Sequence, residues 1–93
     1  MMQAELNVEQ QCLSLSGDWD SQQVALRWNE LLTCQAQELD LAKLKRIDSA
    51  GIAAIITALK PEPSKRLLIK QCPDQAKLLF KLYELDSLLH FED

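Results

Sequence analysis

The chain is poor in the residues from which catalytic and nucleotide-binding sites are most often built. Among its 93 residues there is a single histidine, His90, near the end of the chain. Nothing in the sequence indicates a cysteine or carboxylate partner for it, so we interpret His90 as structural or solvent-facing. The two glycines, Gly17 and Gly51, do not form a phosphate-binding loop, because no Gly-Lys-Ser or Gly-Lys-Thr occurs. We therefore expect a protein that is not an enzyme.

Positive charge and long hydrophobic stretches are also scarce. The formal net charge is −4 at pH 7, whereas binding to nucleic acid or to an anionic membrane surface needs clustered Lys and Arg. No hydrophobic run is long enough to cross a bilayer. Residues 1–5 lack the basic and apolar regions of a signal peptide. We expect a cytoplasmic domain that binds no nucleic acid.

The residues that hold metals are few and scattered. Three cysteines are present, Cys12, Cys34 and Cys72. Their odd number and irregular spacing favour free thiols in a reducing compartment. Four aspartates lie at predicted turns or strand ends, namely Asp18, Asp20, Asp40 and Asp48. If they converged they could hold Mg²⁺, but no further ligand accompanies them. We expect neither a metal nor a cofactor.

The hydrophobic residues that are present predict strands in five places. Alternation of apolar and polar residues predicts a hairpin of strands near 6–8 and 13–15, and a shorter strand at 39–41. A continuous apolar run at 67–69 is typical of an interior strand. Residues 88–91 indicate a short final strand.

Three helices are predicted between these strands. The first begins near residue 20 and runs to about 34, the second runs from the turn at Asp48 to about 60, and the third begins at Pro73. The order β-β-α-β-α-β-α-β predicts a single domain over residues 1–93. Its class is mixed α/β (α+β), with a small mixed sheet of four to five strands and helices on at least one face.

The two tryptophans stand in different contexts. Trp28 falls on the same helical stripe as Val24 and Leu31, which favours a core position. Trp19 lies in a predicted turn at 17–20. There a partly exposed position, of the kind that anchors interfaces, is as well supported as a buried one.

The stretch Ile47–Ile52 is the most informative part of the chain. Asp48 and Ser49 form a polar turn directly before the second helix, and two interpretations of Ser49 stay open. In the first, Ser49 is only the helix N-cap, worth about 1 kcal/mol, with Asp48 adding a favourable interaction with the helix dipole. In the second, a partner contacts Ser49 or a kinase phosphorylates it. A phosphate would add about −1.5 to −2 charge at a helix start, where the fold tolerates it but a docked partner would not.

Two segments resemble motifs of the STAS family, named after sulphate transporters and anti-sigma factor antagonists. Residues 13–20, Leu-Ser-Leu-Ser-Gly-Asp-Trp-Asp, are similar to the family's strand ending in Gly-Glu-Leu-Asp. Residues 39–41, Leu-Asp-Leu, followed by 47–51, Ile-Asp-Ser-Ala-Gly, resemble its Leu-Asp-Leu strand and Asp-Ser-Ser-Gly or Asp-Ser-Ala-Gly turn. The departures are Asp18 for Glu and Trp19 for Leu. The resemblance implies a small sheet with helices packed mainly on one side.

Two branches of the family fit the chain. Anti-sigma factor antagonists bind a serine kinase and are phosphorylated on the serine that matches Ser49. MlaB-type subunits sit on the cytoplasmic ATPase of an ABC transporter that maintains outer-membrane lipid asymmetry. Residues 26–30, Leu-Arg-Trp-Asn-Glu, and 82–85, Leu-Tyr-Glu-Leu, resemble MlaB-type segments. This branch implies an ATPase partner and a place at the inner membrane through that partner.

The resemblance implies a site around the Asp48 turn. We expect Ser49 and Ala50 to contact the partner, Asp48 to hold the turn, and Gly51 to permit close backbone approach. Asp18 and Trp19 are expected neighbours of this surface.

Overall fold

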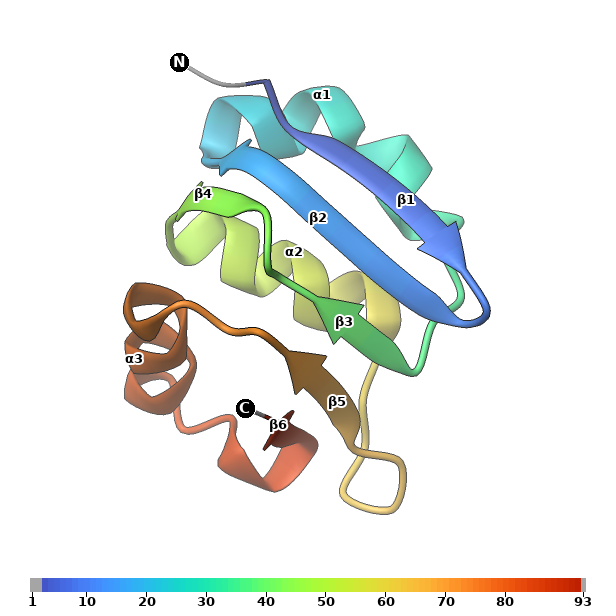
Figure 1. Cartoon of the computed structure of the whole chain (residues 1–93), viewed down its shortest axis with the longest axis vertical. Helices are drawn as coiled ribbons and strands as arrows, with labels where there is room; N and C mark the ends of the chain where they lie inside the picture. The colour runs from blue at the N-terminus through green and yellow to red at the C-terminus, as the bar shows by residue number, and fades with distance from the viewer. Residues whose placement is uncertain (1–2, 93) are drawn as a thin grey trace.

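The computed structural model describes residues 3–92, which contain six β-strands and three α-helices (Figure 1). In chain order the elements are β1 (Glu5–Glu9), β2 (Cys12–Trp19), α1 (Ser21–Leu32), β3 (Glu38–Asp40), β4 (Leu44–Ile47), α2 (Ser49–Leu59), β5 (Leu67–Lys70), α3 (Asp74–Leu82), a 3₁₀ turn η1 (Asp86–Leu88) and β6 (Leu89–Glu92). The mixed α/β class expected from the sequence is confirmed.

The strands form one mixed sheet in the order β1-β2-β3-β5-β6. The short strand β4 lies outside this order and pairs with the C-terminal end of β2. β1 and β2 are an antiparallel hairpin, and the remaining pairs are parallel. The sequence predicted four to five strands, and the additional one is β4. In that strand Lys45 and Arg46 are both exposed between buried Leu44 and Ile47, so it lacks the alternation that marks a half-buried strand.

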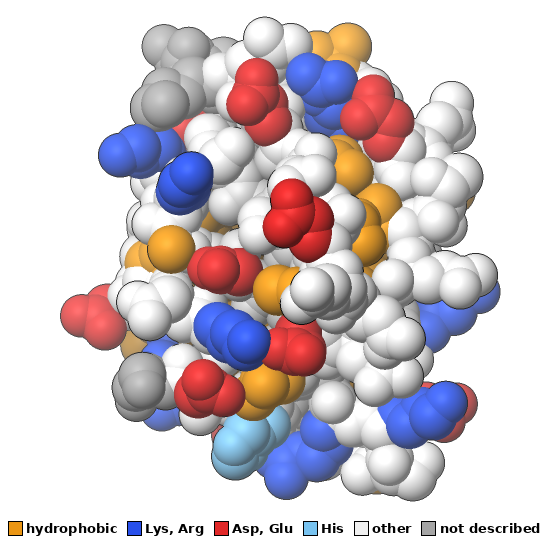
Figure 2. All heavy atoms as spheres, turned by 45° about the vertical axis from the view of Figure 1, so that its right-hand side comes forward, with side chains coloured by type: hydrophobic (Ala, Val, Ile, Leu, Met, Phe, Trp, Pro, Cys, Tyr) orange, Lys and Arg blue, Asp and Glu red, His pale blue; other side chains and the backbone are white. Residues whose placement is uncertain are grey.

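The helices cover one face of the sheet, so the core lies between the two layers. In Figure 1 the strands lie in front of α1 and α2. In the central strands alternate residues point to the helices and are fully buried, as in Leu13 and Leu15 of β2, Leu39 of β3 and Ile69 of β5. The opposite face is polar. Figure 2 shows acidic and basic side chains interspersed on this side, with hydrophobic side chains only in small separate spots.

Trp19 ends β2 instead of standing in a turn. Its side chain is fully buried and its indole Nε1 donates a hydrogen bond to the Ser16 carbonyl oxygen at 3.0 Å. Of the two positions left open for Trp19, the buried one is confirmed and the partly exposed one is wrong. Gly17 precedes Trp19 by two residues in the same strand; its φ of 79° is unfavourable for other residues, and a Cβ there would overlap the Gln3 carbonyl oxygen.

Candidate docking site on helix α2

The turn between β4 and α2 is held by Asp48. Its carboxylate Oδ1 accepts hydrogen bonds from the backbone N–H of Ala50 at 2.9 Å and of Gly51 at 3.1 Å. Asp48 is thus the N-cap of α2, and the expectation that it holds the turn is confirmed. The alternative in which Ser49 is the N-cap was wrong. Ser49 is the first residue of the helix and its side chain is exposed.

Gly51 serves packing inside the domain. It is buried, and a Cβ at this position would overlap the Trp19 carbonyl oxygen and lie 2.6 Å from Ile47 Cγ1. The close backbone approach expected at Gly51 is therefore the approach of α2 to β2 and β4. Gly51 sets the position of the helix start but offers no surface to another molecule.

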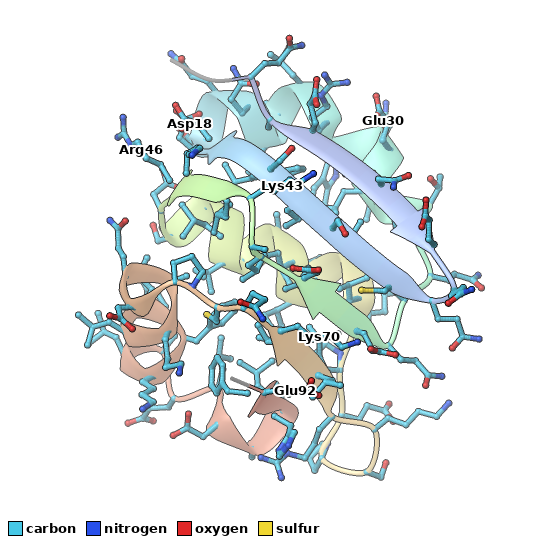
Figure 3. The ribbon with its side chains drawn as sticks, in the orientation of Figure 1. Asp18, Glu30, Lys43, Arg46, Lys70 and Glu92 are labelled. Carbon is cyan, nitrogen blue, oxygen red and sulfur yellow. The ribbon has the colours of Figure 1, made fainter. Side chains whose placement is uncertain are left out.

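Asp18 and Trp19 lie behind this turn, not beside it on the surface. Asp18 is only 4% exposed, and it is paired in register with Arg46 of the neighbouring strand. Figure 3 shows both residues at the same end of the sheet. The carbonyl oxygen of Trp19 faces Gly51 at the helix start. Both residues support the site from within, so a surface site includes neither.

Helix α2 carries no charged side chain between Ser49 and Leu59. Its inner face is apolar and buried, and its outer face exposes only Ser49, Ala53 and Thr57. A helix whose outer face meets water normally carries charges there. These three residues are four apart and share one side of the helix, so they form a small, uncharged surface that another protein element can approach closely.

This outer face is one wall of an open, mainly apolar groove of about 620 Å³. Helix α2 contributes Ser49, Ala50, Ile52, Ala53, Ile56 and Thr57. The segment that follows α3 contributes Tyr83 and Leu85. No residue of this lining is charged. We call this set the α2 groove. Residues 82–85 resemble an MlaB-type segment, but no local pattern places Tyr83 or Leu85 beside α2, because about 30 positions separate them from it and only the fold brings them together.

A tight turn at the end of α3 positions that second wall. The N–H of Leu85 donates to the Phe80 carbonyl oxygen at 3.3 Å and the N–H of Glu84 to the Lys81 carbonyl oxygen at 3.0 Å, the pattern of a Schellman motif. Glu84 occupies its left-handed position with φ 57°. The turn reverses the chain so that Tyr83 and Leu85, on either side of Glu84, both reach the groove.

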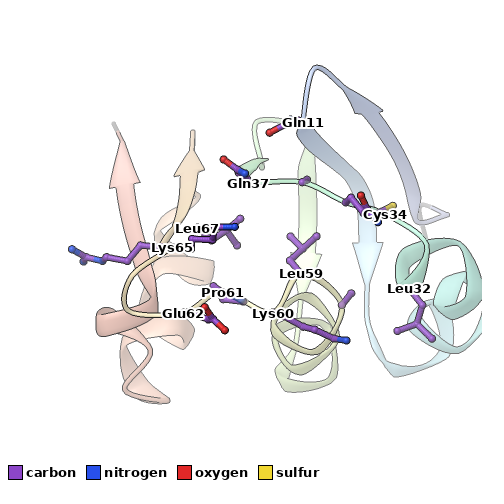
Figure 4. Close-up of a pocket in the computed structure, with 14 residues that line it drawn as sticks. Gln11, Leu32, Cys34, Gln37, Leu59, Lys60, Pro61, Glu62, Lys65 and Leu67 are labelled. Carbon is purple, nitrogen blue, oxygen red and sulfur yellow. The ribbon is translucent and has the colours of Figure 1, made fainter.

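Two other hollows are polar. One lies at the opposite end of α2, where Gln11 and Lys60 are among its lining residues, and in Figure 4 the Lys65 side chain extends away from it. The other, of about 370 Å³, lies on the open face of the sheet near Ser14 and Asp40. Within residues 3–92 no three His, Cys, Asp or Glu side chains are grouped to hold a metal ion.

None of the three cysteines forms a disulfide bond within residues 3–92. Burial raises the pKa of Cys12, and the carboxylate of Glu38 raises it further. Burial likewise raises the pKa of Cys34, with a smaller contribution from Glu30. Raised values keep these thiols protonated at neutral pH and make them poor nucleophiles. No helix in the described part of the chain is both long and apolar enough to span a membrane.

Comparison with known protein families identifies the family of this chain. A family model described as "Mlab, STAS domain" matches residues 2–90. The chain belongs to the STAS-domain family. No curated protein sequence matches the chain.

Two solved STAS structures have the same fold. One is the anti-sigma factor antagonist SpoIIAA in its unphosphorylated form, with 14% identity and a TM-score of 0.63 over 97% of this chain and 87% of that one. The other is the Bacillus cell fate determinant SpoIIAA in its phosphorylated form, with 14% identity and a TM-score of 0.60 over 97% of this chain and 91% of that one. At this identity the likeness concerns the STAS fold.

Proposed function

We propose that this STAS domain is a non-catalytic subunit that binds the cytoplasmic ATPase of an ABC phospholipid transporter of the Mla type and stabilises its active form. In this role it stands at the inner membrane through its partner and contributes to outer-membrane lipid asymmetry. The α2 groove is the surface that docks. The observation that carries the proposal is the uncharged outer face of α2, which continues into an apolar groove and is not needed to close the domain's own core.

The chemistry of the α2 groove supports a protein partner over a small substrate. The groove is open, and the hydroxyl groups in its lining have no base or charged side chain beside them there that could activate them or orient a reacting group. Small side chains at Ala53 and Ser49 let another helix approach closely, and Tyr83 supplies the kind of aromatic side chain that often dominates interface energy. The description of the matching family model favours the Mla branch within the family.

Co-purification tests the identity of the partner. The chain carrying an affinity tag is expressed in its native host, and the proteins that it retains are identified by mass spectrometry. We expect the ATPase of an ABC transporter to be retained by the wild type and lost with Ala53→Glu, which places a charge in the groove. The matched control is Ala25→Glu, an equally simple change at an exposed alanine of α1. Retention of the ATPase by Ala53→Glu would contradict docking through the groove.

A second candidate function is that of an anti-sigma factor antagonist controlled by phosphorylation of Ser49. The exposed hydroxyl at a helix start favours it, as do the two SpoIIAA neighbours. This candidate predicts that the chain captures a GHKL-type serine kinase instead of an ATPase. It also predicts that Ser49→Ala binds that kinase whereas Ser49→Asp does not. If both variants keep wild-type melting and affinity for the captured partner, Ser49 is no functional contact.

A further inference from the structure

Helix α3 has a second apolar surface that lies outside the α2 groove. Its inner face buries Ala76 and Phe80 against the core. Its outer face exposes Leu78 and Leu82, which are one helical turn apart. Their surfaces are 70% and 69% accessible. The helix stands at the edge of the molecule, so this face is open to another chain (Figure 1). Two adjacent exposed leucines on a nine-residue helix are more than a solvated face requires.

Charged residues of opposite sign stand at the two ends of this face. Asp74 begins α3 and Lys81 stands in its last turn, and both are exposed. Their spacing of four and three residues from Leu78 places all three on one side of the helix. The ion pairs that form within residues 3–92, Arg27–Glu30 and Lys70–Glu38, involve neither of them.

This arrangement is complementary to itself. If two α3 helices pack antiparallel about a two-fold axis near Leu78, Asp74 of each copy faces Lys81 of the other, so the charge pair forms twice. Leu78 then meets Leu78, and Leu82 packs beside Gln75. We propose that the outer face of α3 binds a second copy of this chain through this antiparallel contact.

The size of the contact indicates how strong the dimer is. A helix of nine residues is about 13 Å long, so the contact is smaller than the roughly 800 Å² per partner of a stable interface. We therefore expect a weak dimer that forms reversibly as concentration rises. It uses the outer face of α3 and not the α2 groove, so it does not depend on the proposed function.

Sedimentation equilibrium of the isolated chain is the first test. Between about 10 μM and about 1 mM the average mass of the wild type should rise towards that of a dimer. Leu78→Glu should stay monomeric throughout. The matched control is Leu26→Glu, which changes a leucine of α1 with 71% of its surface exposed and should dimerise like the wild type. A monomeric wild type, or equal behaviour of the two variants, would overturn the proposal and leave the α3 face to a different protein.

Charge reversal is the second test. It shows which residues of the two α3 helices face each other, whereas the leucine variant tests only the apolar contact. Asp74→Lys alone and Lys81→Glu alone should each weaken self-association about tenfold, since two like-charge contacts replace two attractive ones. An equimolar mixture of the two variants should regain wild-type association, because every facing pair is then of opposite sign. Circular dichroism checks that each variant is folded, as both changes oppose the helix dipole. A mixture that associates no better than its components would refute the antiparallel contact.

Discussion

The separate roles of Asp48 and Ser49 can be tested by removing each side chain. Asp48→Ala removes the acceptor of two backbone hydrogen bonds of 2.9 and 3.1 Å at the start of α2. Loss of an N-cap costs about 0.5–2 kcal/mol, and the lost carboxylate charge beside the helix dipole adds about 0.3–1 kcal/mol. We expect the free energy of unfolding to fall by about 1–2 kcal/mol, and Tm to fall by roughly 5–15 °C for a domain of this size.

Two matched variants separate the cap from its neighbour. Asp48→Asn keeps an acceptor oxygen and loses only the charge, so it should cost less than Asp48→Ala. Ser49→Ala should change stability by no more than about 0.5 kcal/mol, because the Ser49 side chain is exposed at the first helical position. Urea unfolding followed by circular dichroism measures all three. If Ser49→Ala is as destabilising as Asp48→Ala, the hydroxyl is the true cap and it is not free for a partner.

Further predictions concern packing, strain and the thiols. Gly51→Ala should destabilise the domain by about 1–3 kcal/mol, because the new methyl would overlap the Trp19 carbonyl oxygen; an unchanged urea midpoint would contradict this contact. Glu84→Gly should stabilise by about 0.5–1 kcal/mol, because Glu84 holds φ at 57°, and a Tm that does not rise would argue against the strain. Cys12 should be alkylated more slowly at pH 7 than the thiol of a cysteine in an unfolded peptide, because burial and then Glu38 raise its pKa. The folded state therefore holds this proton more tightly than the unfolded state. The stability contributed by Cys12 is fully present below the unfolded-state pKa and is lost as the pH rises through the folded-state value. Cys12→Ser should flatten that loss in alkaline urea titrations, and an unaltered pH profile would refute the assignment.

Much of the fold follows from local pattern. Alternating Leu13 and Leu15, the apolar run of β5 and the spacing of apolar residues in α2 predict elements that the structure contains. The sequence did not predict β4, because its two adjacent residues Lys45 and Arg46 both face solvent and break the alternation of buried and exposed residues. The position of Trp19 stayed open because residues 17–20 indicate a turn, whereas β2 continues to Trp19 and its side chain is fully buried.

The candidate site was predictable in position but not in composition. Asp and Ser are both good N-caps, so the sequence at 48–49 leaves the first helical residue uncertain by one position. The structure resolves this in favour of Asp48 and leaves Ser49 exposed. Tyr83 and Leu85 join α2 only through tertiary packing after the turn at Glu84, and no short-range pattern reports that proximity.

The affinity of the purified chain for the ABC ATPase that it retains is the most direct test of docking through the α2 groove. Titration calorimetry would compare the wild type with Ala53→Glu in the groove and Ala25→Glu outside it, after thermal unfolding has shown all three to be folded. We predict that Ala53→Glu weakens binding at least about tenfold, since it buries an unpaired charge in an uncharged interface, while Ala25→Glu binds like the wild type. Equal affinities for all three proteins would contradict the docking surface described for this STAS domain.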